Sequence, residues 1–151
     1  MRRNRFFWWV LAGLWIGILF VPGCGKKGDP IIPAQLRLPA AIGDLRAASS
    51  AEGMILRWSA PFPVVLTGSF RILRSDTKAA EACPGCPQEY RTLVQLPLGD
   101  GRLQRDGEKG IRYFDGSVSA GYFYSYRVTV CNPGGDCGEA SNAAQGVYQR
   151  H

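Results

Sequence analysis

The fold of this chain is decided by residues 122–131, whose sequence is YFYSYRVTVC. Aromatic and apolar side chains recur there at every second position, namely Tyr122, Tyr124, Tyr126, Val128 and Val130. The positions between them include the polar residues Ser125, Arg127 and Thr129. A two-residue period places alternate side chains on opposite faces of a β-strand, whereas a helix requires a period of 3.6 residues. We therefore predict a long strand with one buried face.

The same alternation, interrupted by turn residues, continues along most of the chain. We expect seven strands, near residues 42–47, 54–58, 70–74, 90–96, 111–115 and 122–131 and in a last stretch that reaches about Tyr148. Within 70–74 we expect Phe70 and Ile72 to point inward and both arginines, Arg71 and Arg74, to point outward. Short strands separated by turn signals, without a long helical pattern, predict an all-β fold of two packed antiparallel sheets.

Several of these stretches resemble, in order, the fibronectin type III pattern. The matching positions are 45, 56–61 (LRWSAP), 70–74 (FRILR), 113–115 (YFD) and 121–132, within a region from about Pro39 to Tyr148. The resemblance implies a seven-stranded antiparallel fibronectin type III or immunoglobulin-like sandwich. It also implies that Trp58 packs between the sheets and that the hydroxyl of Tyr124 bonds to the backbone near the preceding turn. Residues 76–87 form an insertion longer than the family usually has.

The start of the chain has the pattern of an export signal. Residues 1–5 contain three arginines and no acid, and residues 6–21 carry no charge. A cationic start, an apolar core and small residues at a cleavage site are typical of a secretory signal peptide. The core of 16 residues is shorter than the ~20 residues of a membrane-spanning helix. Val21-Pro22-Gly23-Cys24 resembles the bacterial lipobox, which implies cleavage before Cys24 and acylation of that residue; an uncleaved anchor is the alternative.

We thus predict three parts: a signal peptide at 1–23, a lipidated Cys24 with a Pro/Gly-rich tether at 24–39, and one sandwich domain at 40–149. Gly25, and not aspartate, follows the lipidated residue, and in this the sequence resembles lipoproteins that are sorted to the outer membrane. We therefore expect a lipid-anchored cell-envelope protein in that membrane. The start CGKKGDP (24–30) also resembles the CGxKGP start of small lipoproteins that assist lipopolysaccharide assembly, with Asp29 inserted. This resemblance implies an alternative role as an outer-membrane assembly accessory.

The net charge does not indicate a nucleic-acid partner. The chain has 18 Lys and Arg against 12 Asp and Glu, a net charge of +6, but three arginines lie in the predicted signal peptide, which leaves 15 against 12, or +3. No cluster of basic residues follows Lys26-Lys27, whereas nucleic-acid binding requires several together. We expect the membrane, through the lipid on Cys24, and an envelope protein or polysaccharide as partners.

The stretch Cys83-Pro84-Gly85-Cys86 is the one motif that suggests redox chemistry. A CxxC pair at the start of a helix has a thiol of lowered pKa and exchanges disulfides. Here no strand–helix–strand pattern surrounds the pair, and the prolines on both sides of Cys86 disfavour a helix start. We expect a structural disulfide between Cys83 and Cys86, as in an oxidising compartment, with thiol-redox activity and metal binding as alternatives.

The four cysteines other than Cys24 also suggest a Cys₄ zinc site, because they form two close pairs. In the sandwich that the resemblance implies, the strands that carry the two pairs run antiparallel, so the pairs lie at opposite ends. A ten-residue strand at ~3.3 Å per residue separates them by about 30 Å, which is too far to share a metal. We therefore expect two local disulfides, Cys83–Cys86 and Cys131–Cys137, and no metal site.

No arrangement typical of catalysis is evident in the sequence. The single histidine, His151, is the last residue, and acids such as Asp115 lie in turns, where a carboxylate accepts backbone hydrogen bonds. We predict a non-catalytic binding or scaffolding domain without a cofactor. Because Trp58 and the even-numbered tyrosines are expected in the core, Phe62 on a loop and Phe123 on the outer face are the candidates for a contact patch.

Overall fold

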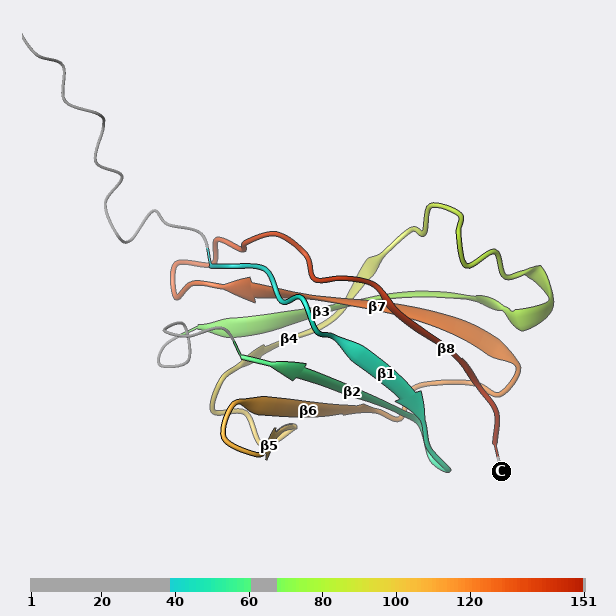
Figure 1. The fold of residues 1–151 in the computed structure, drawn as a ribbon, viewed down its shortest axis with the longest axis horizontal. Helices are drawn as coiled ribbons and strands as arrows, with labels where there is room; N and C mark the ends of the chain where they lie inside the picture. Colours follow the sequence, from blue (N-terminus) through green and yellow to red (C-terminus); the bar gives the residue numbers. More distant parts are fainter. Residues whose placement is uncertain (1–38, 61–67, 151) are drawn as a thin grey trace, which may run out of the picture. The chain divides into compact units, whose positions relative to one another are not determined.

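The computed structural model describes residues 39–60 and 68–150, which form eight strands in two antiparallel sheets packed face to face (Figure 1). The first sheet has the order β1 (Arg46–Ser49), β2 (Met54–Ser59), β6 (Gly110–Asp115), β5 (Leu103–Asp106). The second sheet has the order β4 (Arg91–Pro97), β3 (Ser69–Lys78), β7 (Tyr122–Cys131), β8 (Ala144–Tyr148). A short 3-10 helix, η3 (Ala79–Glu81), follows β3. The all-β sandwich is confirmed, with eight strands where the sequence predicted seven.

The additional strand is β5, an edge strand of the first sheet. Of its four residues only Leu103 is buried, and the other three are exposed. It pairs with β6 through a turn at Gly107, whose φ of 76° lies in the left-handed region that favours glycine. A strand with a single buried side chain has no alternation, and this is why the two-residue period did not reveal it.

The core lies between the two sheets and is rich in aromatic side chains. Along β7, Tyr124, Tyr126, Val128 and Val130 are each 3 % exposed or less, which confirms the predicted inner face except at the half-buried Tyr122. The opposite face of the strand is also largely buried, which the alternation did not predict. From the first sheet, Trp58 is 3 % exposed and meets Phe70 of β3 edge to face, with ring centroids 5.3 Å apart. Trp58 thus packs between the sheets, as expected. A buried aromatic removes roughly 150–250 Å² from water, at roughly 25 cal/mol per Å².

The pair β3–β7 forms the centre of the second sheet. The two strands pair over ten residues each, from Ser69 opposite Cys131 to Lys78 opposite Tyr122. The loop with Cys83 and Cys86 follows the Lys78 end, whereas Cys131 lies at the Ser69 end. The two cysteine pairs are therefore connected to opposite ends of the β3–β7 ladder.

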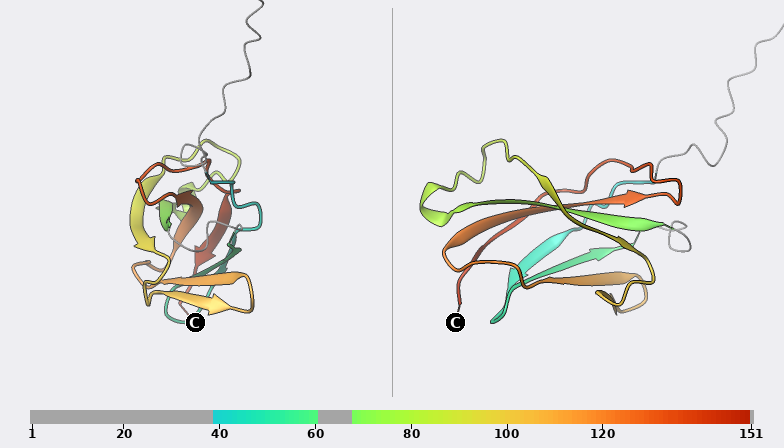
Figure 2. Two further views of the ribbon diagram at one scale, coloured as in Figure 1. Left: turned by 90° about the vertical axis from the view of Figure 1, so that its left-hand side faces the viewer. Right: turned by 180° about the vertical axis from the view of Figure 1, so that it is seen from behind.

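The segment 79–90, between β3 and β4, lies over the outer face of the second sheet, away from the first sheet (Figures 1 and 2). The backbone N–H of Ala79 donates to the carbonyl of Gly121, and the hydroxyls of Tyr90 and Ser125 are 2.7 Å apart. Ser125 is 0 % exposed although it faces outward. The segment 79–90, which overlaps the insertion expected at 76–87, therefore buries part of the outer face of the second sheet.

Several predictions concern residues outside the described ranges. They are the signal peptide at 1–23, the lipidated Cys24, the tether up to residue 38, and Phe62. Among the residues that the structure does describe, none belongs to a helix with the length and apolar character needed to cross a membrane.

Candidate functional site

A buried polar cluster joins the two sheets at the end of β6. Its centre is Asp115, which is 2 % exposed. One carboxylate oxygen accepts hydrogen bonds from the backbone N–H of Ser117 at 2.9 Å and from its hydroxyl at 2.6 Å. The other accepts from Nη1 of Arg74 at 3.0 Å and from the hydroxyl of Tyr126 at 2.9 Å. Because Arg74 belongs to β3 and Tyr126 to β7, the cluster ties the first sheet to the second.

The position of Arg74 corrects the expectation that both arginines of β3 point outward. Arg74 has the same parity as Phe70 and Ile72, it lies opposite Tyr126 in the sheet, and its side chain is 12 % exposed. Its guanidinium also lies over the ring of Tyr124, 5.4 Å from the centroid. A charged side chain is stable inside a protein when it is paired and hydrogen-bonded, and Asp115 supplies that partner.

The protonation states in this cluster follow from its contacts. Burial alone would raise the pKa of Asp115, but hydrogen bonds from Ser117, Arg74 and Tyr126 outweigh it and hold the pKa below its usual value. Burial, together with the nearby charge of Asp115, raises the pKa of the Tyr126 hydroxyl far above its usual value. Asp115 is therefore an anion that already accepts four hydrogen bonds, and the cluster is structural. The expectation that Asp115 accepts backbone bonds of its turn is confirmed.

A second contact stabilises the turn before β7. The hydroxyl of Tyr124 accepts a hydrogen bond of 2.7 Å from the backbone N–H of Ser119. This is the contact with the preceding turn that the resemblance implied for Tyr124, and it fastens the connection between β6 and β7 to the core.

The structure brings together both predicted cysteine pairs. The sulfurs of Cys83 and Cys86 are 1.98 Å apart, and those of Cys131 and Cys137 are 2.01 Å apart, which is the distance of a disulfide bond. Cys131 is 0 % exposed, whereas Cys83 and Cys86 are on the surface. In the described part of the chain, no group of three or more His, Cys, Asp or Glu side chains is placed to hold a metal ion.

Of the two phenylalanines expected in a contact patch, the structure describes Phe123 and does not describe Phe62. Phe123 lies on the outer face of β7 but is only 7 % exposed, so the expectation of an accessible ring is wrong. The reason is that the outer face of the second sheet is partly a buried layer, which the alternation of a single strand does not reveal. Phe62 belongs to the residues that are not described. Among those that are, the exposed large apolar side chains are Phe114 and Val147.

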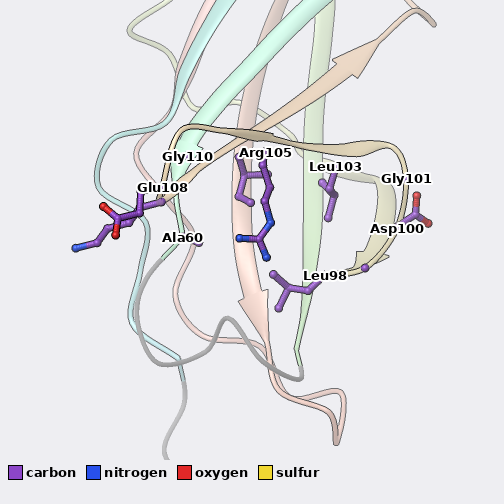
Figure 3. Close-up of a pocket in the computed structure, with 11 residues that line it drawn as sticks. Ala60, Leu98, Asp100, Gly101, Leu103, Arg105, Glu108 and Gly110 are labelled. Carbon is purple, nitrogen blue, oxygen red and sulfur yellow. The ribbon is translucent and has the colours of Figure 1, made fainter.

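A hollow of about 280 Å³ lies beside β5 and β6 (Figure 3). Leu98 and Leu103 contribute to its apolar lining, and the side chain of Arg105 extends across it (Figure 3). At its rim, Asp100 accepts hydrogen bonds from Arg102, which lower the pKa of Asp100 to about 2. One wall is Ala60, which directly precedes the undescribed residues 61–67, so we assign no ligand to this hollow.

Two further hollows flank the disulfide-tied segment 79–90 on the outer face of the second sheet. The first, of about 560 Å³, is lined in part by Asp76 and Arg91, which form an ion pair with each other. The second, of about 680 Å³, we call the Arg127 groove. It is lined by Leu73, residues 84–88, Tyr90, Arg127, Ala140, Ala143 and Gln145.

Arg127 lies on the polar face of its strand, as the alternation predicts, but the alternation does not predict this groove. The groove arises because the insertion returns Tyr90 and residues 84–88 to the middle of the sheet, and the guanidinium of Arg127 lies over the ring of Tyr90. The sequence features that point to this region are an arginine in the centre of a long strand and an insertion between two strands. These features do not predict that Tyr90 and residues 84–88 lie beside Arg127.

Comparisons with known proteins do not assign the chain to a family. The sequence matches none of the protein-family models with which it was compared, and it has no significant match among curated proteins.

Proposed function

We propose that this chain is a lipid-anchored protein of the bacterial cell envelope whose fibronectin type III-like sandwich is a non-catalytic binding or scaffolding module. The fold part of the proposal is supported by the strand order. Lettered along the chain as A, B, C, C′, D, E, F and G, the strands give the sheets A-B-E-D and C′-C-F-G. Immunoglobulin-like sandwiches have A-B-E-D on one sheet and C-F-G on the other. The buried Trp58 and the turn contact of Tyr124 agree with this fold.

The anchoring part of the proposal is supported by the sequence. The cationic start, the uncharged run at 6–21 and the small residues before Cys24 are the features that an exported, acylated chain requires. Two cysteine pairs at disulfide distance agree with an oxidising compartment outside the cytoplasm.

The binding role is supported by one observation above all. The insertion 79–90 is tied by the Cys83–Cys86 pair and fastened to the sheet, and it leaves two hollows at its flanks. Loops held on a rigid scaffold are the usual location of binding sites. The buried carboxylate of Asp115, in contrast, is fully used in joining the sheets.

The anchoring and the binding role are tested in the native envelope. Metabolic labelling with a radioactive fatty acid is expected to label the original chain and not Cys24→Ser, and the variant is expected to leave the outer-membrane fraction. Cross-linking from the sandwich surface, followed by mass spectrometry, is expected to yield the same partner in repeated preparations. An unlabelled chain, or a variant that fractionates like the original, contradicts the anchor; a sandwich that cross-links to nothing contradicts the binding role.

Thiol-redox activity of Cys83 and Cys86 is the alternative hypothesis. An insulin-reduction assay distinguishes it from a non-catalytic binding role. We expect no activity above that of the variant in which both cysteines are serine. Reduction of insulin by the original chain alone would favour the redox function.

A further inference from the structure

We propose that the Arg127 groove binds a peptide segment that presents one carboxylate flanked by apolar residues. The inference rests on the proposed binding role and assigns it a site and a chemical class of partner. It is carried by the geometry of Arg127, by the missing acceptor for its guanidinium, and by the lining of the groove.

The guanidinium of Arg127 lies over an aromatic ring that is itself held in place. Its Cζ lies 5.2 Å from the centroid of the Tyr90 ring. Tyr90 is itself anchored, because its hydroxyl is 2.7 Å from that of Ser125, which is 0 % exposed and also accepts a hydrogen bond from the amide of Gln145. The N–H donors of a guanidinium lie in one plane, and a carboxylate can accept two parallel hydrogen bonds from them.

Arg127 also lacks an acceptor within the described part of the chain. Its Nε is shielded from solvent and donates no hydrogen bond, and none of the ion pairs includes it. Two other arginines of this sheet have acceptors: Arg71 donates to the side chain of Gln95, and the more deeply buried Arg74 donates from Nη1 to Asp115, although its Nε likewise donates no hydrogen bond. A partly desolvated charge without a counter-charge is unfavourable, and a carboxylate in the groove would supply both the charge and the acceptor.

The lining indicates which kind of anion fits. Among the described residues that line the groove, Arg127 is the single charged one, and Leu73, Ala140 and Ala143 contribute apolar walls. Polyanions such as nucleic acids, and surfaces of anionic lipid, are held by several cations together. One cation between apolar walls matches one carboxylate with apolar neighbours. The volume of about 680 Å³ lies within the roughly 300–1,000 Å³ of typical ligand sites.

The test uses the full chain, labelled with ¹⁵N and held in detergent micelles. The Nε–H signal of Arg127 is assigned by its loss in Arg127→Gln. Three blocked peptides serve as probes, Ac-Ala-Leu-X-Leu-Ala-NH₂ with X as Glu, Gln or Lys. We expect the Glu peptide to shift the Arg127 signal saturably and the Gln and Lys peptides to bind at least tenfold more weakly. Arg127→Gln is expected to weaken binding of the Glu peptide at least tenfold.

Arg71→Gln is the matched control, because Arg71 is a half-buried arginine on the same face with an acceptor of its own. It is expected to bind the Glu peptide like the original chain, and the backbone amide spectrum verifies that each variant is folded. Equal binding of the Glu and Gln peptides, unchanged binding by Arg127→Gln, or no saturable shift with any peptide overturns the proposal. A shift with phosphatidylglycerol vesicles but not with the Glu peptide overturns it in favour of a lipid surface.

A cross-linking experiment distinguishes this failure from failure of the proposed function. A photoreactive residue is placed in the envelope-anchored chain either at Ala143, in the groove, or at Gln104, which is exposed on the first sheet. Cross-links to protein at Ala143 that are lost with Arg127→Gln agree with the inference. Cross-links at Gln104 alone retain the binding role and overturn the groove, and an absence of cross-links at both positions overturns both.

Discussion

Removal of the carboxylate of Asp115 is expected to destabilise the sandwich more than any change at an exposed ion pair. In Asp115→Ala, the guanidinium of Arg74, whose side chain is 12 % exposed, remains inside without its counter-charge, and the hydroxyl of Tyr126 loses its acceptor. Loss of one partner of a buried ion pair destabilises a protein by about 3–5 kcal/mol. The contributions within one network are not additive, so we expect the free energy of unfolding to fall by about 4 kcal/mol in total.

The matched control is the exposed ion pair Arg57–Asp106, whose atoms are 2.9 Å apart and whose side chains are 51 % and 49 % exposed. Asp106→Ala is expected to lower the free energy of unfolding by less than about 1 kcal/mol, because solvent screens such pairs. Urea denaturation measures both variants. A chain that starts at Cys24 contains Trp58 as its one tryptophan, so the fluorescence of this buried residue reports unfolding directly.

A third variant separates the buried charge from the lost contacts. In the double variant Arg74→Met with Asp115→Leu, both charges are absent, and replacement of a buried pair by apolar residues is often close to neutral. The double variant is therefore expected to be more stable than Asp115→Ala alone. The reasoning is refuted if Asp115→Ala is no less stable than Asp106→Ala, or if the double variant is the least stable of the three.

Three further predictions use the same denaturation assay. The pKa values of Asp44 and Asp115 are both lowered in the folded chain. The stability that these carboxylates contribute is therefore present above the unfolded pKa of about 3.9 and is lost as the pH falls through the folded pKa values. In Asp115→Asn the free energy of unfolding should fall less steeply at acid pH, and an unchanged dependence on pH would contradict the role of Asp115. Tyr124→Phe removes the acceptor of a backbone N–H in the turn before β7 and should destabilise by about 1 kcal/mol, whereas unaltered stability would mean that water replaces the hydroxyl. Serine at both Cys131 and Cys137 should destabilise by about 2 kcal/mol, as expected for a short closed loop, and a variant as stable as the original would show that the turn needs no cross-link.

The parts of the fold that the sequence predicted are those with a local repeating signal. The alternation in 122–131 identified the central strand β7 and its buried face, and Trp58 was placed in the core. β5 was missed because it has one buried residue and lies at an edge. The two cysteine pairs were predicted because the two cysteines of each pair are close in sequence, with separations of 3 and 6 residues.

The errors at the candidate site have a different physical origin. Arg74 was placed outward because an arginine on an inner face is unfavourable unless it is paired, and its partner Asp115 belongs to the other sheet. Phe123 was placed on an accessible face because the alternation within one strand does not show what covers its outer face. The two-residue period itself puts Arg74 on the same face as Phe70 and Ile72, and only the carboxylate of Asp115, on the other sheet, shows why an arginine is stable there.

The contrast between Arg74 and Arg127 follows from the face of the sheet on which each side chain lies. The two arginines lie in adjacent rows of the β3–β7 ladder, because Arg74 is opposite Tyr126 and Leu73 is opposite Arg127. Arg74 faces the interior, where an unpaired charge is strongly unfavourable, and it is paired with a carboxylate that accepts four hydrogen bonds. Arg127 faces an open groove, where water partly solvates its charge and the fold does not require a partner. A ligand that displaces this water must therefore provide a hydrogen-bond acceptor for the guanidinium of Arg127. Arg127 can form this new hydrogen bond on binding because no acceptor in the described part of the chain already occupies it.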